Sequence, residues 1–390
     1  MPYLTREEHE ARVAHVRRVM EERGLDIVLV YYDEFNIGNG WYLTGWCPQF
    51  ESGAVLVPRR GACMILGGPE SEPFAKLDSA VTETRNNPAF MVPDEEYPNA
   101  AIVDFPALFA EIRRTLGSVR RAGLVGAGRM PVECHRQIAA GLAGVELVDI
   151  TGDYVRLRFV KSDWEREQVR AAFALADRSY EAMKGAVRPG ASEIEVAAAG
   201  EYAARSRGAS GFGFSAIAGS GPRSNAVVPA ASGRAMAAGE LVMIGIAPKV
   251  NGYAGVVGDT LPVSGTFTAG QRVCMEHLRQ AFVLTREQLV PGRTGRQIDR
   301  PARDYFARHG LSRYLVCPFC HTIGLHEAES PFFGPHSDDE LAPGMTVCID
   351  VSFFGHPEWN GVRLETGYEI TASGAVPLSP SMDRLLSSAR

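Results

Sequence analysis

Apolar and polar residues alternate along the first half of the chain in the manner of an α/β domain. A polar helical stretch begins at Thr5, which forms a capping-box pattern with Glu8, and runs to about Gly24. Short apolar runs bounded by turn residues then predict strands. These runs are Asp26–Tyr32, Gly53–Pro58, Ala62–Leu66, Leu124–Val125 and Val145–Ile150. Helix and strand therefore follow each other through the first half.

The pattern changes around Arg156–Lys161. Ser162 and Glu165 form a second capping-box pattern, and a long amphipathic stretch follows it. We therefore expect an N-terminal α/β domain over residues 1–157 and a second domain over residues 158–390. A chain of 390 residues is long enough for two domains of ordinary size.

The second half contains an internal repeat. Pro189-Gly190 and Pro291-Gly292 each precede an amphipathic helical pattern that ends at a glycine, Gly208 or Gly310. Strand-like runs then match in order: residues 239–244 with 344–349, and 253–263 with 362–371. Two α–α–β–β units related by a pseudo-twofold axis predict a curved antiparallel sheet with helices outside it. A site is expected on the concave face.

Composition narrows the class of protein. The chain carries a formal net charge of −6 and has no long basic run, so we expect neither nucleic acid nor an anionic membrane as a partner. The polar first residues show no secretory signal, and no apolar run is long enough to span a bilayer. Seven scattered cysteines favour a reduced, cytoplasmic protein.

The densest chemistry lies between Cys317 and Glu329, in the sequence CPFCHTIGLHEAE. Two histidines, His321 and His326, flank Gly324, which permits a turn or a close backbone approach. His321 is the candidate metal ligand. We expect His326 either to face substrate or to hold a neighbouring carboxylate such as Glu327 or Glu329, with a purely structural histidine as the alternative.

Two carboxylates further along interrupt apolar strand-like runs. Asp350 and Glu365 would be costly to bury unless they are paired or bind a cation. Aligning the two repeats places Gly245 opposite Asp350 and Asp259 opposite Glu365. Three carboxylates and His321 would suit one Mn, Fe, Co or Zn ion. The alternative for Asp350 alone is a buried, hydrogen-bonded side chain.

Other motifs are weaker. Cys317–His321 matches a haem-attachment signature, but such attachment needs an exported protein, so we reject it. Cys320 could reach the site, or could be a small buried side chain. The Gly219–Arg223 turn lacks the spacing of either nucleotide fingerprint. Arg223 is a candidate for binding a substrate carboxylate.

Several of these segments carry a family resemblance that covers the whole length. The chain resembles the pita-bread family, which includes methionine aminopeptidases, Xaa-Pro dipeptidases, aminopeptidase P and creatinases. The segments that carry it are Phe35–Ile37, Trp41–Gly45, Lys161–Glu165, His321–Leu325, Pro343–Thr346 and Arg363–Glu365.

The resemblance implies a fold and a ligand set. It implies a creatinase/prolidase-type N-terminal domain followed by a pseudo-twofold pita-bread domain. The family's peptidases bind two metal ions with Asp, Asp, His, Glu and Glu, which fall here on Gly245, Asp259, His321, Asp350 and Glu365. The family's substrate-contacting histidine is also missing, because residues 227–231 read VVPAA. We therefore predict at most one divalent ion, held by the last four of these residues, or a site that works without metal.

The leading functional hypothesis is hydrolysis of a C–N bond in a small amide or Xaa-Pro-like, imino-acid substrate. The candidate catalytic residues are His321, His326, Asp350 and Glu365, and the candidate substrate-binding residues are Tyr253, Arg223, Arg363 and Trp41. A catalytically silent binding protein and a lyase or natural-product tailoring enzyme are the alternatives. Relatives with this N-terminal domain form homodimers, so the resemblance also implies a homodimer. The aromatic cluster Trp41, Tyr42 and Trp46 would serve the partner's pocket or would be ordinary core.

Overall fold

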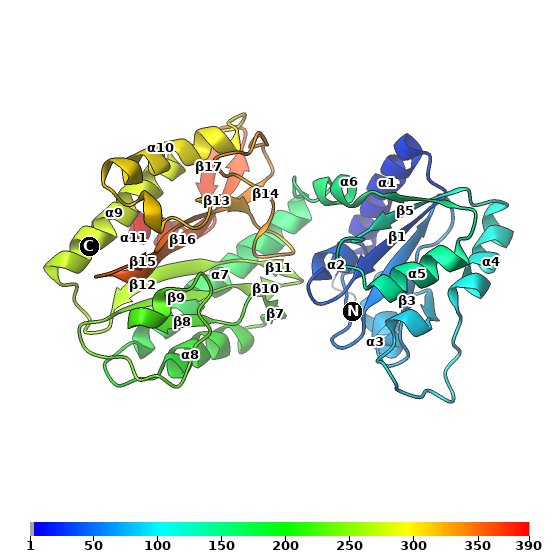
Figure 1. Ribbon diagram of the computed structural model, residues 1–390, viewed down its shortest axis with the longest axis horizontal. Coiled ribbons are helices and arrows are strands. Elements are labelled where there is room, and N and C mark those ends of the chain that lie inside the picture. Colours follow the sequence, from blue (N-terminus) through cyan, green and yellow to red (C-terminus); the bar gives the residue numbers. More distant parts are fainter. Residues whose placement is uncertain (1–3, 390) are drawn as a thin grey trace. The chain divides into compact units, whose positions relative to one another are not determined.

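The computed structural model describes residues 4–389 and divides into two compact units, residues 1–158 and 159–390 (Figure 1). The division falls one residue beyond the boundary expected from sequence. Within the described residues, no helix combines the length and the apolar character needed to cross a membrane.

The N-terminal unit is built on a six-stranded mixed sheet in the order β4-β3-β2-β1-β5-β6. The central strand β1 is buried along its whole length, which is why its sequence is apolar throughout. The strands are β1 Ile27–Tyr32, β2 Gly53–Pro58, β3 Met64–Gly67, β4 Thr84–Asn86, β5 Arg121–Val125 and β6 Glu146–Asp149. The helices are α1 Arg6–Arg23, α2 Ile37–Thr44, α3 Glu72–Asp78, α4 Phe105–Leu116, α5 Val132–Gly141 and α6 Thr151–Arg156.

The second unit is built on a large antiparallel sheet in the order β14-β13-β15-β16-β12-β9-β8, with β17 beside β16 (Figure 1). Its strands are β8 Ile217–Ser220, β9 Leu241–Ile246, β12 Val257–Pro262, β13 Cys320–Thr322, β14 Glu329–Phe332, β15 Thr346–His356, β16 Asn360–Thr371 and β17 Gly374–Pro377. A small second sheet holds β7 Gly211–Phe212, β10 Pro248–Val250 and β11 Tyr253–Ala254. The helices are α7 Asp163–Ala186, α8 Glu193–Arg205, α9 Ala269–Arg286, α10 Gly295–Arg308 and α11 Pro380–Ser387.

The strand order displays the internal repeat. The run β8-β9-β12 mirrors the run β13-β15-β16, and the two runs meet where β12 pairs with β16. Each half contributes a helix pair, α7 with α8 and α9 with α10. Ser162 closes a reciprocal capping box with Glu165 at the start of α7. Gly208 and Gly310, which follow α8 and α10, have the positive φ that stops a helix, at 99° and 71°.

The two faces of the large sheet differ in chemistry. Ile244, Val257 and Ile349 point to the face that packs against α7–α10, and they belong to the main hydrophobic core. Because side chains alternate along a strand, the residues between them point to the opposite face. That opposite face carries the candidate chemistry.

Candidate functional site

Three predicted residues meet on the face of the sheet turned away from the helices. His321 on β13, Asp350 on β15 and Glu365 on β16 each offer a ligand atom, and these atoms all lie within 4.8 Å of one another. All three side chains are buried. We call them the His321 cluster.

Strand register brings the cluster together. Asp350 and Glu365 are direct partners in the β15–β16 ladder, so their side chains share a face. His321 is paired with Cys348, which lies two residues before Asp350 and therefore points the same way. Residues far apart in sequence thus reach one point through two adjacent strand pairings.

Arg363 lies beside the His321 cluster. It precedes Glu365 by two residues on β16 and shares its face. Its Nε donates a hydrogen bond to Asp350 Oδ1 at 2.9 Å and lies 3.9 Å from Glu365 Oε2. Because the guanidinium is buried, it supplies a fixed positive charge beside the two carboxylates.

A fourth acidic residue, Glu327, also faces the cluster. Its Oε1 lies 3.7 Å from His321 Nε2, the same distance that separates Nε2 from Glu365 Oε1. The sequence identified Glu327 only as one of two carboxylates that His326 was expected to hold if it did not face substrate. Its one signal was its position beside His326 in an otherwise chemically dense loop.

The charges of these groups shift one another's pKa values. Burial alone would lower the pKa of His321, but the nearby Glu365 and Glu327 carboxylates outweigh it and raise the pKa to about 9. Burial, together with the charge of Glu365, raises the pKa of Glu327 to about 8. Burial raises the pKa of Asp350 to about 6 against the opposing effect of Arg363. Burial also acts on Glu365, yet His321 and Arg363 hold the pKa of its carboxyl below its usual range.

Asp259 does not join the cluster, which corrects its prediction as a metal ligand. In the β12–β16 pairing, Glu365 faces Gly258 and not Asp259. Asp259 is paired with the core residue Ile244 and points to the helix-covered face, where its Oδ2 accepts a hydrogen bond from Tyr180 of α7 at 2.8 Å. The symmetric counterparts of Asp350 and Glu365 are therefore two glycines, Gly245 and Gly258, which pair with each other.

Neighbouring side chains occupy the space that carboxylates at these glycines would need. A Cβ at Gly258 would lie 2.9 Å from Arg363 Cδ and 3.0 Å from both Cβ and Oε2 of Glu365. A Cβ at Gly245 would lie 3.0 Å from the side chain of Ile217. The first half of the repeat thus offers no ligand, and its space is filled by an isoleucine and by the arginine of the second half.

Two predicted substrate-binding residues have other partners. The Tyr253 hydroxyl donates to Glu165 Oε1 at 2.7 Å, and the ring packs edge-on against Trp164. Arg223 Nε donates to the fully buried carboxylate of Glu193 at 2.9 Å. Neither belongs to the His321 cluster.

The remaining candidates lie in different surroundings. His326 is half-buried in the segment after β13, and its carbonyl accepts a hydrogen bond from the Gly324 amide. Trp41 is on α2 of the N-terminal unit. Cys320 points to the helix-covered face and belongs to the main core, which is the alternative expected for a small buried side chain. Cys317 is half-buried and interacts electrostatically with the cluster: burial, and then the charge of Asp350, raise the pKa of its thiol.

The structure explains why residue 324 is a glycine, for which the sequence offered either a turn or a close backbone approach. A Cβ at this position would lie 2.3 Å from Glu329 Oε1 and 2.9 Å from Lys161 Cε. Lys161 Nζ and Glu329 Oε1 form an ion pair at 2.9 Å, and both side chains are almost fully buried. A close approach, and not a positive φ, therefore requires the glycine.

Replacing Lys161 by methionine is expected to destabilise the protein by about 3–5 kcal/mol, because the Glu329 carboxylate would stay buried without its counter-ion. The measurement is the free energy of unfolding by urea at neutral pH. The double variant K161M/E329M is the control, and it should recover most of the loss because both charges are gone. Equal losses in the single and double variants would contradict this account.

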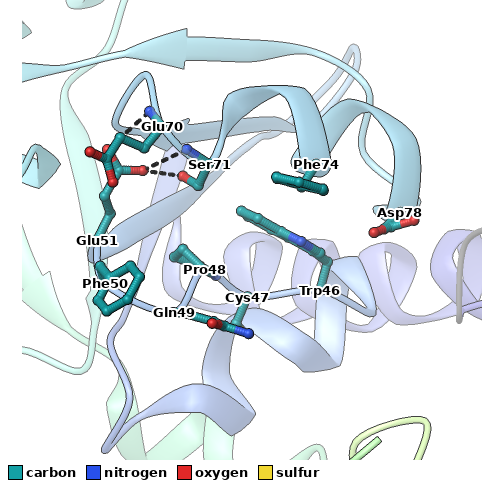
Figure 2. A pocket seen from close by; sticks show the side chains of 10 residues that line it. All are labelled: Trp46, Cys47, Pro48, Gln49, Phe50, Glu51, Glu70, Ser71, Phe74 and Asp78. Atoms are coloured by element: carbon teal, nitrogen blue, oxygen red, sulfur yellow. Dashed lines mark hydrogen bonds between the residues drawn. The ribbon is translucent and has the colours of Figure 1, made fainter.

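The N-terminal unit has a pocket of about 420 Å³ with an aromatic and acidic lining (Figure 2). Its lining includes Glu51, whose Oε2 accepts a hydrogen bond from the Ser71 amide at 3.0 Å. Figure 2 shows the Trp46 indole and the Phe74 ring on the same side of the pocket. None of its lining residues is basic; they are Trp46, Cys47, Pro48, Gln49, Phe50, Glu51, Glu70, Ser71, Phe74 and Asp78.

This pocket separates the members of the predicted aromatic cluster. Trp46 lines it, whereas Tyr42 is buried, packs edge-on against Tyr154 and lies under the Arg12 guanidinium. Tyr42 is therefore ordinary core. A role for Trp41 and Trp46 toward a partner subunit stays a prediction.

A curled antiparallel sheet made of two pseudo-twofold halves, with a buried histidine and carboxylates on one face, defines the protein as a pita-bread hydrolase. Two family models match the chain: Creatinase/Prolidase N-terminal domain over residues 12–160, and Metallopeptidase family M24 over residues 167–372. The chain belongs to metallopeptidase family M24 and is a hydrolase of the Xaa-Pro peptidase superfamily. The fold and the family expected from sequence are confirmed.

Similar proteins span almost the whole chain. An Xaa-Pro dipeptidase of Pyrococcus horikoshii is 29% identical over 376 residues, which covers 96% of this chain and 98% of the relative. A probable dipeptidase PepE of Mycobacterium tuberculosis is 29% identical over 342 residues and covers 84% and 90%. The crystal structure of the prolidase from Pyrococcus horikoshii has a TM-score of 0.79 at 23% identity, with 94% and 97% coverage.

Family membership implies a divalent metal, so the donor set must be tested against one. His321 Nδ1 lies 3.0 Å from the Thr322 carbonyl, a geometry in which Nδ1 carries the hydrogen and Nε2 is left as the ligand atom. Nε2 and single oxygens of Asp350 and Glu365 then converge within 4.8 Å. One imidazole and two carboxylates fit one divalent ion. They do not fit two, because Gly245 and Gly258 contribute no donor.

Proposed function

We propose that this protein hydrolyses a C–N bond in a small Xaa-Pro-like dipeptide or related imino-acid amide, and that it uses a single divalent ion. The names of the relatives support the substrate class. The observation that carries the proposal is the convergence of His321, Asp350 and Glu365 beside Arg363, opposite two glycines. This arrangement retains the ligands from the second half of the repeat, whereas the first half, which would complete a two-ion site, contributes none.

The residues of the site have separable roles in the proposed reaction. A divalent ion held by His321, Asp350 and Glu365 would supply Lewis acidity toward the scissile carbonyl and would make water more acidic. Asp350, whose pKa is raised to about 6, is suited to take a proton from the attacking water and pass it to the leaving nitrogen. Glu365 stays ionised, since the pKa of its carboxyl is held below its usual range.

Two further residues would act on the substrate. Arg363 fixes the orientation of Asp350 through the 2.9 Å hydrogen bond and places positive charge where negative charge develops on the carbonyl oxygen. His326, five residues after His321, is the candidate that orients the substrate. Water then adds across the C–N bond, and the products are a carboxylic acid and an amine or imino acid.

Metal content and chelation test this proposal. Elemental analysis of the purified protein should find close to one divalent ion per chain and not two. Hydrolysis of an Xaa-Pro dipeptide should fall on treatment with a chelator and return on addition of Mn²⁺ or Zn²⁺. Two ions per chain would contradict the one-ion site, and metal-independent turnover would assign the reaction to the side chains alone.

A catalytically silent binding protein is the second candidate. The absence of a carboxylate at Gly245 and Gly258 and of a histidine between residues 227 and 231 favours it. The buried charges of the His321 cluster argue against it, because burying them is costly without a task. Binding of an Xaa-Pro dipeptide to the metal-loaded chain without cleavage would establish this second function.

A further inference from the structure

Glu327 has no role in the ligand set that the resemblance carries over, yet it is placed as a ligand would be. Its side chain is 15% exposed, and its Oε1 has no hydrogen-bond partner among the residues that the structure describes. A buried carboxylate oxygen without a donor costs free energy and points to a group that the protein alone does not supply.

The donor atoms around Glu327 indicate the kind of group that would satisfy it. His321 Nε2 faces Glu327 Oε1 and Glu365 Oε1, while Nδ1 is directed at the Thr322 carbonyl. Both distances are 3.7 Å, too long for a hydrogen bond. Two carboxylate oxygens and an imidazole nitrogen that face one another across this gap need a shared cation, and a divalent metal ion would take the place of the proton on Nε2.

The charge of the site sets the valence of the cation. Glu327, Asp350 and Glu365 carry three negative charges when ionised, and Arg363 carries one positive charge. A metal ion would displace the protons of His321 and Glu327, and the sum is then −2, which one divalent ion cancels. Without Glu327, the same count is −1.

The origin of Glu327 explains how the chain could keep an ion after losing its other ligands. Asp350 and Glu365 come from the second half of the repeat, and the first half offers only Gly245 and Gly258. Glu327 comes from the segment between β13 and β14, outside the two strand pairs. Its carboxylate is not part of the group whose atoms all lie within 4.8 Å of one another, although its Oε1 lies 3.7 Å from His321 Nε2.

We propose that Glu327 is the fourth protein ligand of a single divalent ion held by His321, Asp350 and Glu365. This assignment rests on the one-ion form of the proposed function. It gives a site of one imidazole and three carboxylates, a donor set suited to Mn²⁺, Fe²⁺, Co²⁺ or Zn²⁺.

Calorimetric titration of MnCl₂ and of ZnCl₂ into the chelator-treated full chain tests the assignment. The unmodified protein should bind one equivalent of metal. Glu327→Gln removes the charge and keeps the size of the side chain, and it should weaken metal binding by at least about 10–100-fold, the loss typical even for outer-shell partners. Glu340→Gln makes the same change at an exposed residue and should leave the affinity unaltered.

Each outcome separates the ligand assignment from the function. If Glu327→Gln binds metal as tightly as the unmodified chain, Glu327 is not a ligand, and the one-ion site stands on the other three residues. If the unmodified chain binds no metal, both the assignment and the metal-dependent form of the function fail. Glu327→Asp, which keeps the charge, should bind more tightly than Glu327→Gln, and thermal melting without metal checks that both variants fold.

Discussion

Replacing His321 by alanine is expected to lower turnover of an Xaa-Pro dipeptide by more than about 100-fold, the upper end of the loss that follows when an outer-shell partner of a metal ligand is removed. His321 supplies the only nitrogen donor of the cluster, and its ring lies against both Glu327 and Glu365. The change should act on kcat, because the lost group stabilises the reacting centre. Steady-state kinetics measure it.

A matched control separates chemistry from folding. His336→Ala removes an exposed histidine from the same unit and should leave turnover unchanged. Circular dichroism and thermal melting should show His321→Ala folded, because β13 keeps its backbone pairing with β15. Full activity of a folded His321→Ala variant would exclude the cluster from the reaction.

The elements of the fold could be predicted because local signals agreed with one another. The apolar run at β1, the capping box at Ser162 and the helix-stopping glycines after α8 and α10 each appear in the structure where the sequence placed them. The repeat added information beyond any single element, since it predicted two units related by a pseudo-twofold axis, and the structure shows these units meeting where β12 pairs with β16.

The site was predictable only to within one residue, and that residue decides the ligand set. Gly258 follows Gly245 by thirteen positions, whereas Glu365 follows Asp350 by fifteen. An alignment of the halves without strand pairing cannot locate this difference inside the connecting turns. The alignment therefore matched Glu365 with Asp259 and not with Gly258. A shift of one residue along a strand moves a side chain to the opposite face of the sheet, which is why Asp259 is not a ligand.

Glu327 and Arg363 show the other limit of sequence reasoning. Arg363 was expected at substrate, but its hydrogen bond to Asp350 depends on a direction that only the folded ladder reveals. Glu327 lies in a segment without regular structure, so no periodicity assigns its side chain to a face. Sequence located the chemistry in the right loop, and packing selected the residues.

The two glycines of the first half make a last prediction possible, since restoring a carboxylate there is expected to harm the protein. Gly258→Ala places a Cβ within 3.0 Å of Arg363 and Glu365, and we expect it to cost about 1–3 kcal/mol of stability through overpacking. Gly258→Asp adds a buried charge next to Glu365, and we expect a further loss of about 3–5 kcal/mol. Urea unfolding of both variants in the presence of a chelator measures these losses.

The comparison of the two variants separates crowding from charge, and metal analysis then connects stability with function. Gly258→Asp should not acquire a second ion, because the Arg363 side chain occupies the adjoining space and Ile217 fills the position beside Gly245. The metal content should therefore stay at one ion per chain or fall below it. A Gly258→Asp protein that is as stable as its parent and holds two ions would show that Arg363 yields its place, and that the site is a two-ion centre lacking only one carboxylate.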